Sequence, residues 1–153
     1  MIDDRDLYLE HAPAVMRYAT ALVGPDDAAD VVSAVIARVM AAGGLTRLDD
    51  ARAYLFRAVL NEARNLHRSR MRGAAAVVRI GPAPTAPAAE DEVHPEIVDA
   101  VMALPVRQRA VVYLVYWEGL TIGQAAERLG LRPATARRYL FLARQKLRRV
   151  LDG

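Results

Sequence analysis

The pattern of apolar and polar positions predicts helices along most of the chain. Between residues 6 and 23, apolar side chains recur every three or four positions, as on the buried face of an amphipathic helix. The residues that share this face are Leu7, His11, Ala14, Val15, Tyr18, Ala21 and Leu22. Pro13 lies inside this segment and predicts either a kink or a later start of the helix. We expect His11 to pack against its neighbours rather than to bind a ligand, because it lies on the apolar face.

A second helix is expected after the turn at Gly24, Pro25 and Asp26, and Gly43 and Gly44 end it. Its inward positions are Ala28, Val32, Val35, Ile36 and Val39. Its outward positions are Asp30, Ser33, Ala34 and Ala37. The outward face is therefore small and flat, with one acidic group.

The third expected helix, over about 51–70, has a basic face. Asp49 or Asp50 caps its start. Its buried stripe comprises Leu55, Val59 and Leu66. The opposite side carries basic and amide groups, Arg57, Asn61, Arg64 and Arg68, with Tyr54 and Asn65 on its flank. A face of this kind is more typical of a phosphate-binding surface than of a merely solvated one. The pattern gives no reason for Glu62, which lies near the apolar stripe.

Residues 73–95 have the alanine- and proline-rich composition of a semi-extended linker. At about 3.3 Å per residue such a linker spans at most ~75 Å, which matches on the order of 20 base pairs of duplex. Two short helices are expected beyond it, over 96–103 and 106–117, separated by Leu104 and Pro105.

No stretch of the sequence is typical of a β-strand. We therefore expect an all-α protein with two small helical domains, at 1–72 and 96–153, joined by a flexible Ala/Pro-rich linker.

The stretch from residue 119 to 151 predicts a helix-turn-helix. Thr121 and Gln124 have the spacing of a capping box, and Gly130 can end the short helix that follows. Pro133 suits the first turn of a second helix because it has no N–H to leave unbonded there. On that second helix the inward stripe is Ala136, Leu140, Ala143 and Leu147. The other faces are basic, which favours DNA binding over a membrane-surface or merely solvated helix.

The net charge of +3 conceals a strong segregation of charge. Residues 1–50 contain four arginines against nine acidic residues, whereas residues 51–72 contain six arginines against one acid. Residues 96–153 contain ten basic residues against five acids. This distribution indicates one surface that faces protein and two that face nucleic acid.

The sequence offers no constellation for catalysis or for a bound cofactor. Cysteine is absent, so disulfides and thiolate metal sites are excluded. The three histidines are scattered, Ser33 and Ser69 have no neighbouring base, and there is no glycine-rich phosphate loop. We expect no enzyme activity, no cofactor and no metal site. The acidic start is unlike a signal peptide, and no apolar run reaches the ~20 residues of a membrane span, so a cytoplasmic protein is expected.

Taken in order, these segments resemble a bacterial sigma factor of the extracytoplasmic-function (ECF) type. The strongest match is LPVRQRAVVYLVYWEGLTIGQAAERLGLRPATARRYLFLARQKL, which resembles the family's region 4 throughout. In the first domain, AADVVSAVIARVM resembles the helix of region 2 that docks on the polymerase. YLFRAVLNEARNLHRSRMR resembles the family's helix that contacts the −10 promoter element.

The resemblance implies that the protein directs RNA polymerase core to promoters. Core polymerase and promoter DNA are then its partners, and the resemblance allows an anti-sigma factor as a further partner. Implied contacts with the −35 element are Arg132, Thr135, Arg137, Arg138, Phe141 and Arg144. Implied contacts in the −10 region are Arg57, Asn61, Arg64, Asn65 and Arg68. Implied docking residues for polymerase are Asp27, Asp30, Ser33 and Ala34.

The chain departs from the family pattern at three places. Ser33 and Ala34 stand where glutamine and glutamate are usual, Val39 and Met40 replace common aromatic residues, and Arg132 replaces a capping serine. Two other classes remain open on sequence grounds. One is a dimeric regulator that binds an operator through its helix-turn-helix, and the other is a sigma-like interaction module without polymerase docking.

Overall fold

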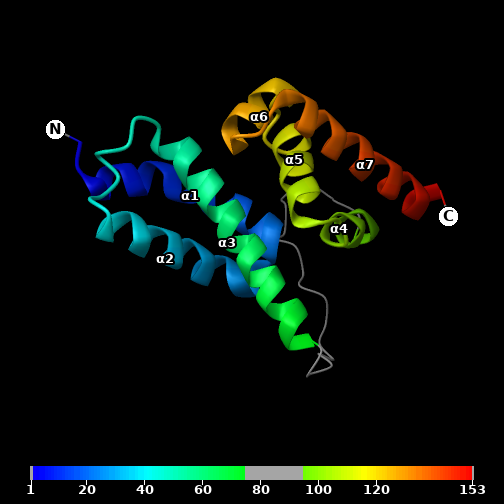
Figure 1. The fold of residues 1–153 in the computed structure, drawn as a ribbon, viewed down its shortest axis with the longest axis horizontal. Coiled ribbons are helices and arrows are strands. Elements are labelled where there is room, and N and C mark those ends of the chain that lie inside the picture. Colours follow the sequence, from blue (N-terminus) through cyan, green and yellow to red (C-terminus); the bar gives the residue numbers. More distant parts are fainter. Residues whose placement is uncertain (1, 75–94, 153) are drawn as a thin grey trace.

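The computed structural model describes residues 2–74 and 95–152, and every regular element within these ranges is an α-helix (Figure 1). The first half contains α1 (Asp4–Val23), α2 (Pro25–Ala41) and α3 (Ala51–Ala74). The second half contains α4 (Pro95–Met102), α5 (Val106–Tyr116), α6 (Ile122–Leu129) and α7 (Pro133–Asp152). The expected all-α class, with two groups of helices, is confirmed.

Helix α1 begins two residues earlier than its apolar pattern indicates. Asp3 and Asp6 form a reciprocal capping box, in which the Asp6 N–H donates to Asp3 Oδ1 at 2.8 Å. Pro13 lies inside the helix and is exposed, so the later start that it suggested is wrong. His11 is half-buried and accepts a hydrogen bond from Arg52 Nε of α3 at 3.2 Å, as expected of a packed histidine.

Two ion pairs join α2 to α3. Arg38 pairs with Glu62, which explains the acid that the helical pattern left without a reason. Arg70 Nη2 lies 2.7 Å from Asp27 Oδ2, nearer the other end of the two helices. The apolar stripes between them pack as expected, with Val31 also buried.

The loop between α2 and α3 is tied to the start of α1. The Thr46 N–H donates to Asp4 Oδ1 at 2.9 Å. Gly44 has φ +93°, and a Cβ there would clash with the carboxylate of Asp4. A side chain at Gly44 would therefore displace the carboxylate that fixes this loop.

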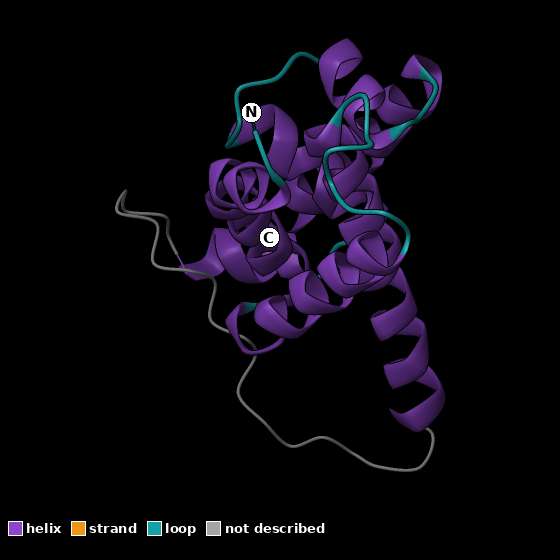
Figure 2. Ribbon diagram, turned by 90° about the vertical axis from the view of Figure 1, so that its left-hand side faces the viewer, coloured by secondary structure: helices purple, strands orange, loops and turns teal. Residues whose placement is uncertain are grey.

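Helix α3 is longer than expected and passes the predicted domain boundary at residue 72. It includes Gly73 and Ala74, and α4 already begins at Pro95. The remainder of the expected linker, 75–94, lies outside the described residues. The last turns of α3 extend past the other helices at the lower end of the molecule (Figures 1 and 2).

In the second half, α5 contacts each of α4, α6 and α7, and α7 likewise contacts the other three helices. Along α5 the residues Ala110, Val111, Val112 and Leu114 are almost fully buried. The helix-turn-helix forms as its caps predict. Thr121 and Gln124 make both bonds of the capping box, and Gly130 ends α6 in the left-handed conformation with φ +68°.

The two halves share one hydrophobic core instead of standing apart. The Tyr18 ring of α1 stacks on Phe56 of α3, with ring centroids 4.4 Å apart. It also lies 5.8 Å from Tyr113 of α5, and all three rings are buried. Helix α3 additionally contacts α6, so the helix-turn-helix is packed against the first half of the molecule.

Candidate nucleic-acid interface

The rotation of α7 about its axis is fixed by its buried stripe. Ala136, Leu140 and Ala143 are at most 1% exposed, while Leu147 is half-buried. The expected readers Arg137, Arg138 and Phe141 are exposed, and the Phe141 side chain is 60% accessible although it is large and apolar. The packing therefore leaves these three side chains, all in the N-terminal half of the helix, directed to solvent.

The remaining −35 candidates lie at the two ends of this surface. Arg132 is exposed directly before α7, and Thr135 is half-buried in its first turn. Arg144 is exposed farther along the helix, where its Nε donates to the Tyr116 hydroxyl at 2.7 Å. The guanidinium carbon of Arg144 lies 5.7 Å from the centre of the Tyr116 ring.

The basic face of α3 forms as expected over most of its length. Asn61, Asn65 and Arg68 are exposed and Arg64 is half-buried. Partial burial lowers the pKa of Arg64, and the nearby positive charges of Arg107 and Arg68 lower it further. A face with several positive charges close together is suited to an anionic ligand such as a phosphate.

Arg57 is placed differently from the other members of that face. Its Nη2 donates to the Glu127 carbonyl oxygen near the end of α6 at 2.7 Å. A Cβ on Gly130 would lie 2.9 Å from Arg57 Nε, so the side chain lies directly against the turn of the helix-turn-helix. Carbonyl groups at a helix C-terminus carry partial negative charge and attract cations. In this arrangement one donor of the exposed Arg57 side chain is bound to the other half of the molecule, while its remaining donors are not used by that bond.

The sequence pattern did not identify Arg109 as a buried structural residue, although it is only 7% exposed. Its Nη2 donates to the carbonyl oxygens of Met102 at 2.7 Å and Leu104 at 2.8 Å, and its Nη1 donates to the Leu22 carbonyl. Burial lowers the pKa of Arg109 to about 10, so it stays charged at neutral pH. The available signal was an arginine directly before the apolar run that begins at Ala110.

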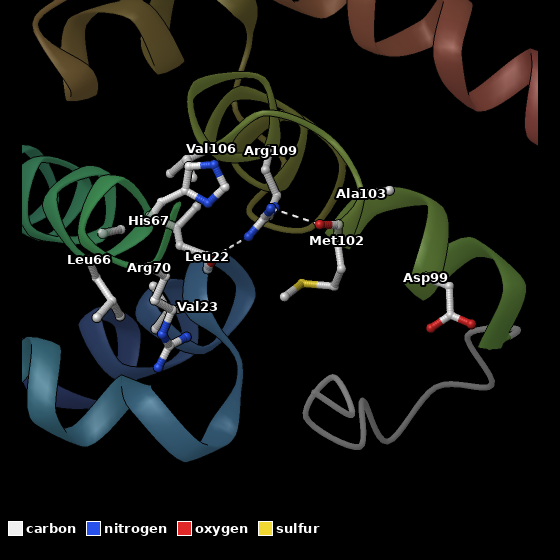
Figure 3. Close-up of a pocket in the computed structure, with 11 residues that line it drawn as sticks. Leu22, Val23, Leu66, His67, Arg70, Asp99, Met102, Ala103, Val106 and Arg109 are labelled. Carbon is white, nitrogen blue, oxygen red and sulfur yellow. Dashed lines mark hydrogen bonds between the residues drawn. The ribbon is translucent and has the colours of Figure 1, made fainter. Parts of the chain in front are cut away.

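A cavity of about 380 Å³ lies next to Arg109, between the ends of α1 and α3 and the α4–α5 corner (Figure 3). Its walls include Leu22, His67, Arg70 and Met102, as Figure 3 shows. The guanidinium of Arg109 donates to backbone carbonyls beside the cavity, and the lining residues come from both halves, so the cavity lies where the two halves meet.

The candidate docking face on α2 is only partly free. Asp30 and Ser33 are exposed and Ala34 is half-buried. Asp27 is the exception because it pairs with Arg70, which neutralises its charge and makes it a link between α2 and α3. Of the two acidic residues in this set, Asp30 is the one that makes no ion pair in the described part of the chain.

Within the described ranges, no group of three or more histidine, cysteine, aspartate or glutamate residues could hold a metal ion. None of the described helices is long and apolar enough to cross a membrane.

Comparison with known proteins matches both halves of the chain to known domain families. The family model for Sigma-70 region 2 matches residues 7–73, and the model for Sigma-70, region 4 matches residues 94–147. No curated protein matches the chain in sequence.

Solved structures with the same fold include the sigma factor RpoE in complex with the anti-sigma factor NepR from Bartonella quintana. That structure is 22% identical, has a TM-score of 0.75, and the match covers 97% of this chain and 96% of that one. Another is CnrH in complex with the cytosolic domain of CnrY, at 24% identity and a TM-score of 0.62, covering 97% and 87%. With regions 2 and 4 paired in this way over most of its length, the chain belongs to the sigma-70 family, as a sigma factor of the ECF type.

Proposed function

We propose that this sigma factor brings RNA polymerase core to specific promoters and initiates transcription there by recognising their −10 and −35 elements. The observation that carries the proposal is the orientation of α7. Its apolar stripe is packed in the core, and that packing exposes Arg137, Arg138 and Phe141 together on the N-terminal half of the helix. In a helix-turn-helix this is the part of the second helix that enters the major groove.

These side chains have complementary chemistry for reading bases. An arginine can donate two hydrogen bonds to the O6 and N7 of guanine, and an exposed aromatic ring can pack on a thymine methyl. Arg132 and Thr135 lie at the start of α7, where backbone and side-chain donors suit a phosphate. We assign Arg137, Arg138 and Phe141 to bases and the other two to the DNA backbone.

The −10 element is assigned to α3. Asn61, Asn65 and Arg68 are exposed on one face together with the half-buried Arg64, so they could contact DNA from a single helix. Arg57 is exposed beside them, and its bond to the Glu127 carbonyl uses only one of the five donors of its guanidinium.

Polymerase docking is assigned to the outward face of α2, through Asp30, Ser33 and Ala34. We expect Asp27 to contribute less, because its carboxylate already pairs with Arg70. One of the similar structures is a sigma factor bound to an anti-sigma factor, and we include a regulator of that kind among the proposed partners.

In-vitro transcription with purified core polymerase tests the proposal. Core with this chain should yield transcripts that start at discrete sites on a promoter library, whereas core alone should not. A variant with Arg137→Ala and Arg138→Ala is the matched control, since both side chains are exposed. It should still bind core but lose the site preference.

Failure to direct transcription, combined with a dimeric mass in solution and binding to a palindromic site, would instead identify an operator-binding regulator.

A further inference from the structure

Tyr116 is the last residue of α5 and lies outside the helix-turn-helix itself. It is 52% exposed, yet it makes two contacts with Arg144 of α7. The Arg144 Nε donates to its hydroxyl at 2.7 Å, and the guanidinium carbon lies 5.7 Å from the ring centre, within the range of a cation–π contact. An exposed aromatic ring therefore restrains one particular arginine of the basic helix.

Because the acceptor is a tyrosine hydroxyl, the contact leaves most of the N–H donors of Arg144, and its charge, available. A guanidinium has five N–H donors, and the bond to Tyr116 uses the single one on Nε. The four donors on the two Nη atoms are not used by that bond. A phenol also carries no charge at neutral pH, so Arg144 keeps its full positive charge. The ion pairs of Arg38 and Arg70 elsewhere in the described structure differ, because a carboxylate neutralises each of them.

The position of Arg144 on α7 indicates the group that it would meet. It lies eleven residues beyond Pro133, the first residue of the helix, which places it about 16 Å along the axis at ~1.5 Å per residue. The first turns of a recognition helix approach the base edges, so a side chain this far along is nearer the DNA backbone. A charged fork with free Nη donors suits the two oxygens of a phosphate.

We propose that Tyr116 is a positioning residue that holds Arg144 ready for a phosphate of the promoter duplex. The inference rests on the proposed function and extends the DNA interface of region 4 to the end of α5. Tyr116 acts through Arg144, since it fixes the side chain before binding and reduces the freedom that the arginine loses on the DNA.

Tyr116→Phe tests this with the smallest change, because it removes the hydroxyl and keeps the ring. Binding of the full chain to a duplex with the −35 element is measured by fluorescence anisotropy over a series of salt concentrations. We expect Tyr116→Phe to weaken binding roughly three- to tenfold, the range for ordering one long side chain on binding instead of before it. The salt slope should stay unchanged, because Arg144 keeps its charge. Arg144→Ala should instead reduce the slope by about 0.9, the value for one phosphate contact.

A double-mutant cycle separates positioning from a merely structural role. In an Arg144→Ala background, Tyr116→Phe should have no further effect, whereas in an Arg149→Ala background the two effects should multiply. Melting temperatures should match the wild type, since both side chains are exposed. Unchanged affinity of Tyr116→Phe, or independent effects of Tyr116→Phe and Arg144→Ala, would overturn the inference.

The same measurements keep this inference distinct from the proposed function. If Arg138→Ala alters base preference while Tyr116→Phe has no effect, promoter recognition stands and the positioning role is wrong. If the wild-type chain shows no preference for any promoter, alone or bound to core polymerase, both proposals are wrong.

Discussion

Arg109 should stabilise both the second half of the chain and its contact with the first. Its guanidinium bonds the carbonyls of Met102 and Leu104 at the α4–α5 corner and the carbonyl of Leu22 at the end of α1. Substitution by methionine keeps much of the length of the side chain but removes every donor. We therefore choose Arg109→Met as the perturbation.

The expected magnitude follows from the environment of the carbonyls. Leu22 and Leu104 are 1% and 2% exposed, so their carbonyl groups would lose their donor in a place that water reaches poorly. Each unsatisfied buried group costs about 1–3 kcal/mol. The variant also avoids burying a guanidinium without a carboxylate partner, which offsets part of the loss. We expect a net decrease in the free energy of unfolding of about 2 kcal/mol.

Urea unfolding followed by circular dichroism measures this quantity. Arg107→Met is a matched control on the same helix, because Arg107 is only half-buried, and it should change the free energy by about 0.5 kcal/mol or less. Arg109→Lys should fail to restore stability, since a single ammonium lacks the planar fork that reaches three carbonyls. Small-angle scattering should show a larger radius of gyration for Arg109→Met, because the bond to Leu22 links the halves.

The pH dependence of the free energy of unfolding gives a second test of the role of Arg109. Burial lowers the pKa of Arg109 from its ordinary value to about 10, so the unfolded chain binds this proton more tightly. As the pH rises above about 10, the Arg109 contribution to the free energy of unfolding should rise, and this rise should be absent from Arg109→Met. A methionine variant at least as stable as the wild type would show that Arg109 does not stabilise the fold, because desolvation would then outweigh the three hydrogen bonds.

Three further predictions concern the proposed contacts. Asp30→Arg should weaken binding to core polymerase with helical content unchanged, because it reverses an exposed charge; full binding in a pull-down would exclude Asp30 from docking. Replacing Arg64 and Arg68 with alanine should lower open-complex formation and flatten the salt dependence of DNA binding, by about 0.9 in the log–log slope per lost phosphate contact. An unchanged slope would mean that this face is only solvated. Arg138→Ala should reduce the binding free energy for the cognate base at one −35 position by ~1–3 kcal/mol. Arg149→Ala should weaken binding to all sequences equally. A library of single-base promoter substitutions measures both, and uniform weakening by Arg138→Ala would assign that residue to a phosphate.

The helices and the helix-turn-helix could be predicted from the sequence, because the residues that specify them lie close together in the chain. The capping box of Thr121 and Gln124 and the stop at Gly130 involve residues a few positions apart, and each appears in the structure as expected. The stripe of Ala136 and Leu140 likewise determined which face of α7 is exposed. A helix start, a helix end and a shared face all follow from the 3.6-residue period and the chemistry of the caps.

The faces of the helices that are buried where the two halves meet depend on tertiary packing. Periodicity showed that Leu55 and Val59 share a face, but it did not show that Phe56 is buried too, beneath the Arg128 side chain of α6. It placed Arg57 among the basic residues of α3 and could not show its bond to the Glu127 carbonyl, 70 positions away.

The same limit applies to the polar contacts that hold the fold together. Arg109 and the Leu22 carbonyl are 87 positions apart, and Glu62 finds Arg38 across 24 positions. Contacts over such separations depend on how whole helices pack, and no spacing in the sequence records them. The sequence therefore predicted which side chains share an exposed helix face, while the packing of the two halves determined which of them also make contacts within the fold.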